Sequence, residues 1–314
     1  MRFNELINIE DINGITFGVE LETFIPNNSN ITVGAWGRPT PINEMDGTVP
    51  TFEGSSWKTE SDSTIAAPSG YKGCEFVSPV LKGEAGLKHL IEFVNWLKSK
   101  GAKVNTSTGC HVHIGIESVI GTMDSSETLD WVVKVGELAK KYSVGIYAST
   151  GTLRNMNRWC KPLCDVTKDT INEAKADNCK RTGLNKVTNS DRYRMVNFNN
   201  IGNRKHTVEF RAFAGTLNTA KLINHVTMSM AIALLAKYNT DARVIWKNYT
   251  YTGVAGFRFI WKYATKIIKL TSLKPMNHKC RMWGMAMAAK WDRKMGNEVS
   301  EAGEAATRWV RARG

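Results

Sequence analysis

The sequence of 314 residues lacks the features that identify several large classes of protein. No apolar run is long enough to suggest a membrane-spanning segment, and the stretch 228–235 has only the pattern of a short core helix. The first residues, MRFNE, carry no signal-peptide pattern, and six cysteines without such a signal are expected to be reduced thiols. Internal repeats and low-complexity tracts are absent as well. We therefore expect a cytoplasmic globular protein that has no membrane partner.

Two familiar catalytic signatures are also absent. The sequence has no Gly-x-x-x-x-Gly-Lys-Ser/Thr motif, which excludes a P-loop nucleotide site. It has no His-Glu-x-x-His motif, which argues against a metal-dependent hydrolase of that type. Cys160, Cys164 and Cys179 lie close together in the sequence, but their spacings match no standard zinc finger. A structural zinc site there is the less favoured alternative.

Charge is distributed unevenly along the chain. Residues 236–314 hold 16 Lys and Arg against 5 Asp and Glu, so this segment carries +11 of the net charge of +13. It also holds five of the ten tryptophans, and basic residues interleaved with aromatics suit contact with a polyanion. The alternative is a helical cap whose tryptophans are core and whose lysines are solvated. We expect a catalytic domain over 1–235 and a basic, helical extension packed on it over 236–314.

The most informative segment is residues 16–24, TFGVELETF, which is largely apolar except for two glutamates. Successive side chains of a strand point to opposite faces, so Glu20 and Glu22 share one face while Val19 and Leu21 fill the other. Neighbouring carboxylates repel each other unless a cation or basic groups lie close to them. Oxygen ligands are also what a hard divalent cation such as Mg²⁺ prefers. The pattern therefore predicts further ligands elsewhere in the chain.

Three more strand-like segments carry polar residues at every second position. They are residues 73–79 with Glu75, residues 109–115 with His111 and His113, and residues 207–213 with Glu209 and Arg211. A sheet with one solvated face would explain any one of them, but four such segments together favour a metal site. By the same alternation, Cys74 and Cys110 are expected in the apolar layer on the opposite face.

Apolar residues at helical spacing predict helices between these strands. The expected helices cover about 84–100, 127–148, 219–238, 253–270, 279–295 and 300–312. A further strand is expected near 193–199, a loop over 26–56, and a polar, partly helical insert over 152–190. Strands that carry polar residues and are separated by helices indicate an α+β fold with a largely antiparallel sheet.

The ordered set of motifs resembles the amidoligase family of carboxylate–amine ligases, which is related to glutamine synthetase and to glutamate–cysteine ligases. The resemblance runs from about Gly14 to His225 and leaves out 26–56 and 236–314. It is carried by FGVELE (17–22), Trp57 with Asp62-Ser63, GCEFVSPVL (73–81), TGCHVHIG (108–115), RYR (192–194) with Asn197, and VEFR (208–211) through GTLN (215–218). It implies a glutamine synthetase-like curved antiparallel sheet, with nucleotide and metals on the concave face and helices on the convex side.

The activity implied by the resemblance is ATP-dependent formation of an amide bond between a carboxylate and an amine, through an acyl phosphate. The cofactors would be ATP and two or more Mg²⁺ ions, with Mn²⁺ also suited because a histidine ligand is expected. The two substrates are not identified by the sequence. The alternative is a non-catalytic protein on a ligase scaffold that binds a nucleic acid or another acidic macromolecule through 236–314.

Metal ligands follow from the family motifs as they stand in this sequence. Glu20 and Glu22 would each serve a different ion. Glu209 and His111 would join Glu20 on the first ion, with a neutral imidazole. Glu75 would complete the shell of the second ion.

Phosphate contacts are also implied by the resemblance. His113 would donate to a phosphate oxygen of ATP, and Arg211 would contact the γ-phosphate, where a bidentate guanidinium fits. Arg194 is a second phosphate candidate, and Asn197 would orient either arginine. Three questions stay open: Arg211 could instead pair structurally with Glu209, Asp62 could face the substrate or serve a turn, and Arg154 and Arg158 could hold a substrate carboxylate or lie in solvent.

Overall fold

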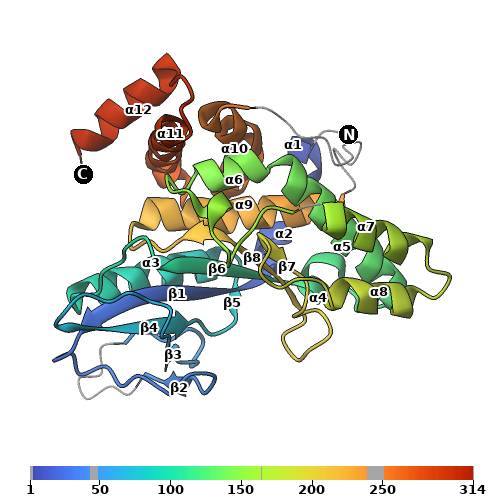
Figure 1. Ribbon diagram of the computed structural model, residues 1–314, viewed down its shortest axis with the longest axis horizontal. Helices are drawn as coiled ribbons and strands as arrows, with labels where there is room; N and C mark the ends of the chain where they lie inside the picture. Colours follow the sequence, from blue (N-terminus) through green and yellow to red (C-terminus); the bar gives the residue numbers. More distant parts are fainter. Residues whose placement is uncertain (1–2, 43–48, 164, 239–250, 314) are drawn as a thin grey trace.

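The computed structural model describes residues 3–42, 49–163, 165–238 and 251–313, and shows an antiparallel sheet covered on one face by helices (Figure 1). The strands are β1 (Thr16–Pro26), β2 (Thr40–Pro41), β3 (Lys58–Ser61), β4 (Tyr71–Val77), β5 (Leu81–Lys82), β6 (Gly109–Gly115), β7 (Val196–Asn197) and β8 (Thr207–Ala214). Their order is β2-β3-β4-β1-β6-β8-β7, with β5 paired to β1. The pairings between these strands are antiparallel, which confirms the predicted α+β class.

Helices fill most of the remaining described chain. They are α1 (Phe3–Leu6), α2 (Ile9–Gly14), α3 (Gly83–Ser99), α4 (Ile116–Ile120), α5 (Ser125–Lys141), α6 (Ser143–Ala148), α7 (Asp165–Ala176), α8 (Lys180–Thr188), α9 (Thr219–Lys237), α10 (Gly253–Leu270), α11 (Asn277–Lys294) and α12 (Glu301–Arg311), with the 3₁₀ turns η1 (Arg154–Met156) and η2 (Lys274–Met276). Asn218 caps α9 by accepting a hydrogen bond from the Lys221 amide. The helix predicted over 127–148 is two helices that meet at Tyr142, and the strand predicted near 193–199 is only two residues long.

The apolar face of the sheet forms the core. Val19 and Leu21 of β1 are buried on it, as the alternation predicted. Helix α3 lies on this face, where Phe93 stacks on Trp57 with ring centroids 3.5 Å apart. The Trp57 indole is satisfied too, because its Nε1–H donates to His89 Nε2 at 2.9 Å. The aromatic pair and its satisfied polar atom fix α3 against the sheet.

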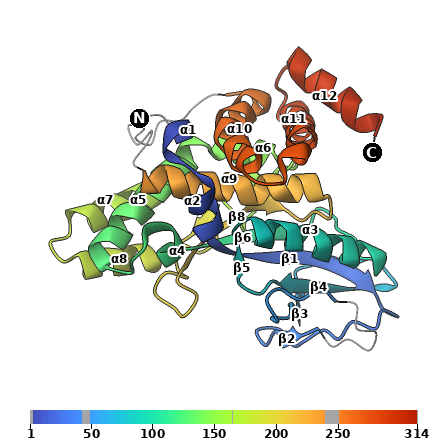
Figure 2. The same cartoon turned by 180° about the vertical axis from the view of Figure 1, so that it is seen from behind.

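Helix α9 lies between the sheet and a second helical layer made of α10 and α11 (Figures 1 and 2). It is apolar on all sides, as expected for a helix covered from both directions. By length and composition alone it is apolar enough to cross a membrane, which corrects the expectation drawn from the sequence. In the described structure 89% of its apolar window is buried inside the protein, so the core accounts for its composition.

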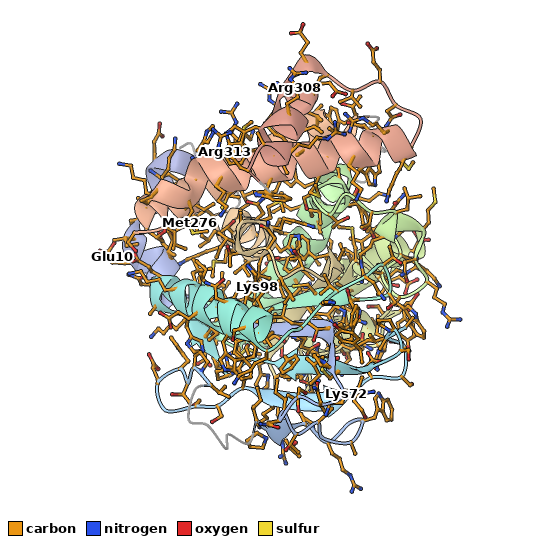
Figure 3. All side chains as sticks on the ribbon, turned by 90° about the vertical axis from the view of Figure 1, so that its left-hand side faces the viewer. Glu10, Lys72, Lys98, Met276, Arg308 and Arg313 are labelled. Carbon is orange, nitrogen blue, oxygen red and sulfur yellow. The ribbon has the colours of Figure 1, made fainter. Side chains whose placement is uncertain are left out.

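The C-terminal helices form the outer layer. Gly303 allows the close contact of α12 with α11, because a Cβ there would lie only 3.0 Å from the side chain of Ala289. Figure 3 shows Arg308 and Arg313 in this layer, on the side of the molecule away from Lys72 of β4. The predicted boundary at residue 235 falls in the last turn of α9, and the division into two domains stays a prediction. Trp246 lies outside the described residues.

Candidate active site

Strand register brings the predicted carboxylates into rows on one face of the sheet. On one side of β1, Glu22 is paired with Glu75 of β4, and Glu75 is paired in turn with Glu60 of β3. On the other side of β1, Glu20 is paired with His111 of β6. Side chains paired across an antiparallel sheet lie on the same face, so these groups converge.

A second row of paired residues runs from β6 to β8 and β7. His113 of β6 is paired with Glu209 of β8, and Glu209 is paired with Asn197 of β7. An irregularity in β6 between Cys110 and Val112 shifts the register. Such shifts re-aim side chains near functional sites.

The rows line a cavity of about 700 Å³. Predicted residues on its wall are Glu20, Glu22, Asp62, Glu75, His111, Asn197, Glu209 and Arg211. The wall also contains groups that the sequence did not single out as site residues, namely Trp36, Glu60, Trp159, Arg192, Tyr193, Asn200, Asn203 and Lys205. Arg154, whose position the sequence left open, is on the wall as well.

Three overlapping groups in the described chain could each hold a metal ion, with ligand atoms within 4.8 Å of one another. They are Glu20–His113–Glu209, Glu20–Glu75–His111 and Glu22–Asp62–Glu75. Glu20 and Glu75 are each shared by two groups, as ligands that bridge adjacent ions would be. Carboxylate oxygens with one imidazole suit Mg²⁺ or Mn²⁺.

The imidazole of His113 fits a metal ligand. Its Nε2 is buried, makes no hydrogen bond within the described residues, and lies 3.1 Å from Glu20 Oε1 and 4.0 Å from Glu209 Oε1. Its Nδ1 is 3.0 Å from Thr207 Oγ1, which fixes the ring as outer partners of metal-bound histidines do. His113 is not among the residues of the cavity wall, and the phosphate-donor role implied by the resemblance stays a prediction.

The pKa values of the carboxylates at the site are shifted in opposite directions. Burial alone would raise the pKa of Glu20, but the charge of His113, the hydrogen bond with His111 and the charge of Lys205 hold it well below its usual value. Lys205 Nζ lies 3.0 Å from Glu20 Oε1, where it acts as a positive partner. By contrast, burial and then the charges of Glu20 and Glu22 raise the pKa of Glu75 well above its usual value. Repulsion among the carboxylates of this face therefore acts on Glu75, whose pKa it raises.

Arg211 reaches the cavity and also pairs with Glu209. Its Nη1 donates to Glu209 Oε1, so the structural pairing that the sequence left open is present. Asn197 Nδ2 donates to the other oxygen of Glu209 at 2.6 Å, and Asn200 Nδ2 donates to the same oxygen at 3.1 Å. Burial would raise the pKa of Glu209, but the positive charges of His113 and Arg211 lower it. Asn197 thus orients Glu209, whereas an arginine was expected.

Arg194 is not among the residues of the cavity wall, and its contact with phosphate stays a prediction. Its Nε lies 3.0 Å from Asp191 Oδ2, and its Nη1 donates to the Pro162 carbonyl. Asp62 fits both of its alternatives. Its Oδ1 accepts hydrogen bonds from the backbone and side chain of Thr64, as in a turn, yet it lines the cavity.

None of the five cysteines in the described residues lies on the cavity wall. Cys74 and Cys110 are buried on the apolar face, as predicted, and burial raises the pKa of the Cys74 thiol to about 12. Cys160 is buried and Cys179 is exposed, and no described cysteine belongs to a potential metal group. Cys164 lies outside the described residues.

Comparison with known proteins agrees with the geometry. A family model described as "Putative amidoligase enzyme" matches residues 13–233. No curated protein matches the chain. A solved structure titled "Crystal structure of novel glutamine synthase homolog" is similar with a TM-score of 0.37 and 10% identity, over 96% of this chain and 72% of that chain.

Proposed function

The chain belongs to the amidoligase family, and from that premise we propose that it joins a carboxylate to an amine at the expense of ATP, with divalent metal ions. The observation that supports the proposal is the set of three overlapping carboxylate groups on one sheet face, two of which include an imidazole. A row of ions suits a substrate that spreads negative charge over several phosphate oxygens.

The chemistry assigns work to the residues of this chain. A carboxylate is a poor electrophile because its leaving group would be an oxide, and transfer of the γ-phosphoryl group converts that oxygen into phosphate. Bound metal ions would neutralise charge on the phosphates, held by Glu20, Glu22 and Glu75 together with the imidazoles and Glu209. Arg211, fixed by Glu209, presents its remaining N–H groups toward the transferred group.

The second half-reaction needs a place for a proton. The amine attacks the acyl carbon, phosphate leaves with the electron pair of the broken C–O bond, and the nitrogen loses one proton. Asp62 is the carboxylate that we assign to accept this proton, in place of a ligand role beside Glu22 and Glu75, because it lies on the wall and its side chain stays partly exposed. It was the predicted substrate-side residue.

The test is release of ADP and phosphate from ATP with Mg²⁺ or Mn²⁺, in mixed pools of carboxylates and amines. We expect release that needs both pools, and its loss in Glu22→Gln. Glu298→Gln is the matched control, because Glu298 is exposed between α11 and α12. ATP cleavage that ignores both pools would contradict the proposal and favour a hydrolase.

A further inference from the structure

The loop between α6 and α7 is part of the cavity although it belongs to the polar insert. Its end is joined to the segment before β7, because the Lys161 amide donates to the Tyr193 carbonyl at 2.9 Å and the Met195 amide donates to the Lys161 carbonyl at 2.8 Å. The loop is thereby fixed beside the sheet. It carries Arg154, in η1, onto the cavity wall.

Arg154 is a buried guanidinium without an acidic partner. Arg154 is only 6% exposed, and no carboxylate in the described chain lies within ion-pair distance of its guanidinium. Nη1 donates to the Thr108 carbonyl at 3.3 Å and Nη2 to the Arg211 carbonyl at 3.2 Å, while the buried Nε has no partner. A guanidinium has five N–H groups, so donors remain available. A buried cation left in this state is costly unless an anion completes it.

The backbone opposite Arg154 is shaped to admit it. A Cβ at Gly109 would lie 3.0 Å from Arg154 Nη2 and 3.1 Å from Glu22 Oε2, so a larger residue would press on both side chains. The cavity's other buried cation, Arg211, is already paired with Glu209, and Lys205 is paired with Glu20. Arg154 therefore differs from both in having no ion pair with a described residue, although Glu22 lies near it at Gly109.

The surroundings of Arg154 are electropositive. Burial, followed by the charges of Lys221 and Arg154, holds the pKa of His225 well below its usual value. Burial and the charge of Lys290 lower the pKa of Lys221 to about 8. No acidic side chain is among the causes of either shift. A carboxylate is also near Arg154, because Glu22 Oε2 lies 3.1 Å and Arg154 Nη2 lies 3.0 Å from the position that a Cβ at Gly109 would take.

We propose that Arg154 binds a carboxylate of the acyl substrate, by a bidentate contact through the N–H groups that the protein leaves free. The proposal rests on the proposed ligase function. We choose a carboxylate and not a phosphate from the place of Arg154 along β6, although Arg154 also lies near Glu22, an assigned metal ligand. Arg154 meets β6 at Gly109, four residues from His113, which is roughly 13 Å along a strand. Arg211 and Lys205, nearer the imidazole rows, supply cations for the nucleotide.

The experiment measures binding of defined probes to the full chain by thermal unfolding. Malonate, glutarate and L-glutamate are each compared with chloride at equal ionic strength. We expect at least one to raise the Tm of the wild type by several degrees, and this rise to be lost in Arg154→Gln and partly restored in Arg154→Lys. Arg158→Gln is the matched control, because Arg158 lies in the same loop but is exposed over the Trp159 ring. It should keep the response.

A second arm titrates ATP with Mn²⁺. Affinity should stay within about twofold in Arg154→Gln, a free-energy change of about 0.4 kcal/mol. A large loss of ATP affinity with an intact carboxylate response would overturn the proposal and assign Arg154 to the nucleotide. So would a wild type that none of the three carboxylates stabilises. Unfolding of Arg154→Gln and Arg154→Met alike would show a structural role, since removing an unpaired buried charge should not destabilise the probe-free protein.

The outcomes separate this proposal from the ligase function on which it rests. If the chain is not a ligase, no pool of carboxylates and amines stimulates ADP release, yet the carboxylate response and its dependence on Arg154 are still measured. If only the Arg154 proposal fails, ADP release persists with an unchanged requirement for carboxylate in Arg154→Gln.

Discussion

The two faces of the sheet are built from alternate residues of the same strands, and they are stabilised in opposite ways. On the covered face, Val19 and Leu21 are close-packed beneath helices, and Phe93 stacks on Trp57. On the cavity face, one step along the same strand, Glu22 is placed beside Glu75. The first face lowers the free energy of the folded chain by burying apolar surface. The second face brings like charges together, which is favourable only when a positively charged group binds among them.

Stability and activity should therefore respond separately to substitutions on the two faces. The largest expected effect is on activity, in Glu22→Gln. We expect ATP turnover to be abolished, because Glu22 belongs to a potential metal group and lies on the cavity wall. The metal-free Tm should not fall. Steady-state ADP release and thermal unfolding measure the two quantities, and near-normal turnover would remove Glu22 from the metal assignment.

The next effect is on stability, in Phe93→Ala on the covered face. Phe93 is fully buried against Trp57, and loss of such a side chain costs about 3–5 kcal/mol. Denaturant unfolding should show this loss, while ATP affinity measured on the remaining folded protein stays close to normal. Lys98→Ala, on the exposed side of α3, is the control. A selective loss of activity in Phe93→Ala would mean that the two faces are coupled.

Arg211→Lys tests the cavity face without changing its charge. Lysine keeps the positive charge but loses the planar fork, so we expect roughly a hundredfold loss of kcat, the scale of a positioned donor. ATP affinity should change much less. Weak ATP binding with a normal rate at saturation would instead place Arg211 in ground-state binding.

Because of Glu75, the stability of the cavity face should depend on pH. Burial and the charges of Glu20 and Glu22 raise the pKa of Glu75 in the folded chain, so its contribution to stability is present at acid pH and is lost as pH rises through that pKa. We expect the Tm of the metal-free wild type to fall as pH rises through this pKa, and the Tm of Glu75→Gln to fall less. Mn²⁺ should restore the wild type at high pH and have little effect on the variant. Parallel pH curves in the two proteins would contradict the assigned repulsion.

The smallest effect is expected from the outer helical layer. Helix α12 is buried only along a narrow side that contains Gly303 and Ala306. Its Arg308 and Arg311 are exposed. We propose that this basic layer contacts an acidic macromolecule. Deleting 299–314 should leave folding and basal ATP turnover intact and weaken binding of a labelled RNA oligonucleotide. That binding should decline with salt in the wild type, as counterion release requires.

Replacing Arg308, Arg311 and Arg313 together by Gln is the matched variant, because it removes charge and keeps the helix. Equal RNA binding by both variants and the wild type would exclude the partner. Unfolding of the deletion variant alone would show that α12 is a structural cap, and Trp309, partly buried beside His278, would be the residue responsible.

The sequence by itself determined the local features of this protein. Alternation at period two placed Glu20 and Glu22 on one face of a strand, and helical spacing with an Asn218 cap located α9 closely. These features depend only on neighbours along the chain, so a single sequence contains them. The motif order also sufficed to indicate the family, because each motif is a short local pattern.

Only the tertiary structure decided which local patterns meet. The pairing of Glu60 with Glu75 depends on register between strands, which no local period specifies. Lys205 and Arg154 come from loops, where side-chain direction follows no repeat, and the burial of Arg154 results from contacts with β6 and β8. The ion pair of Arg194 with Asp191, three residues earlier, was not predicted either. Residue types are set by the sequence, whereas convergence in space is set by long-range pairing.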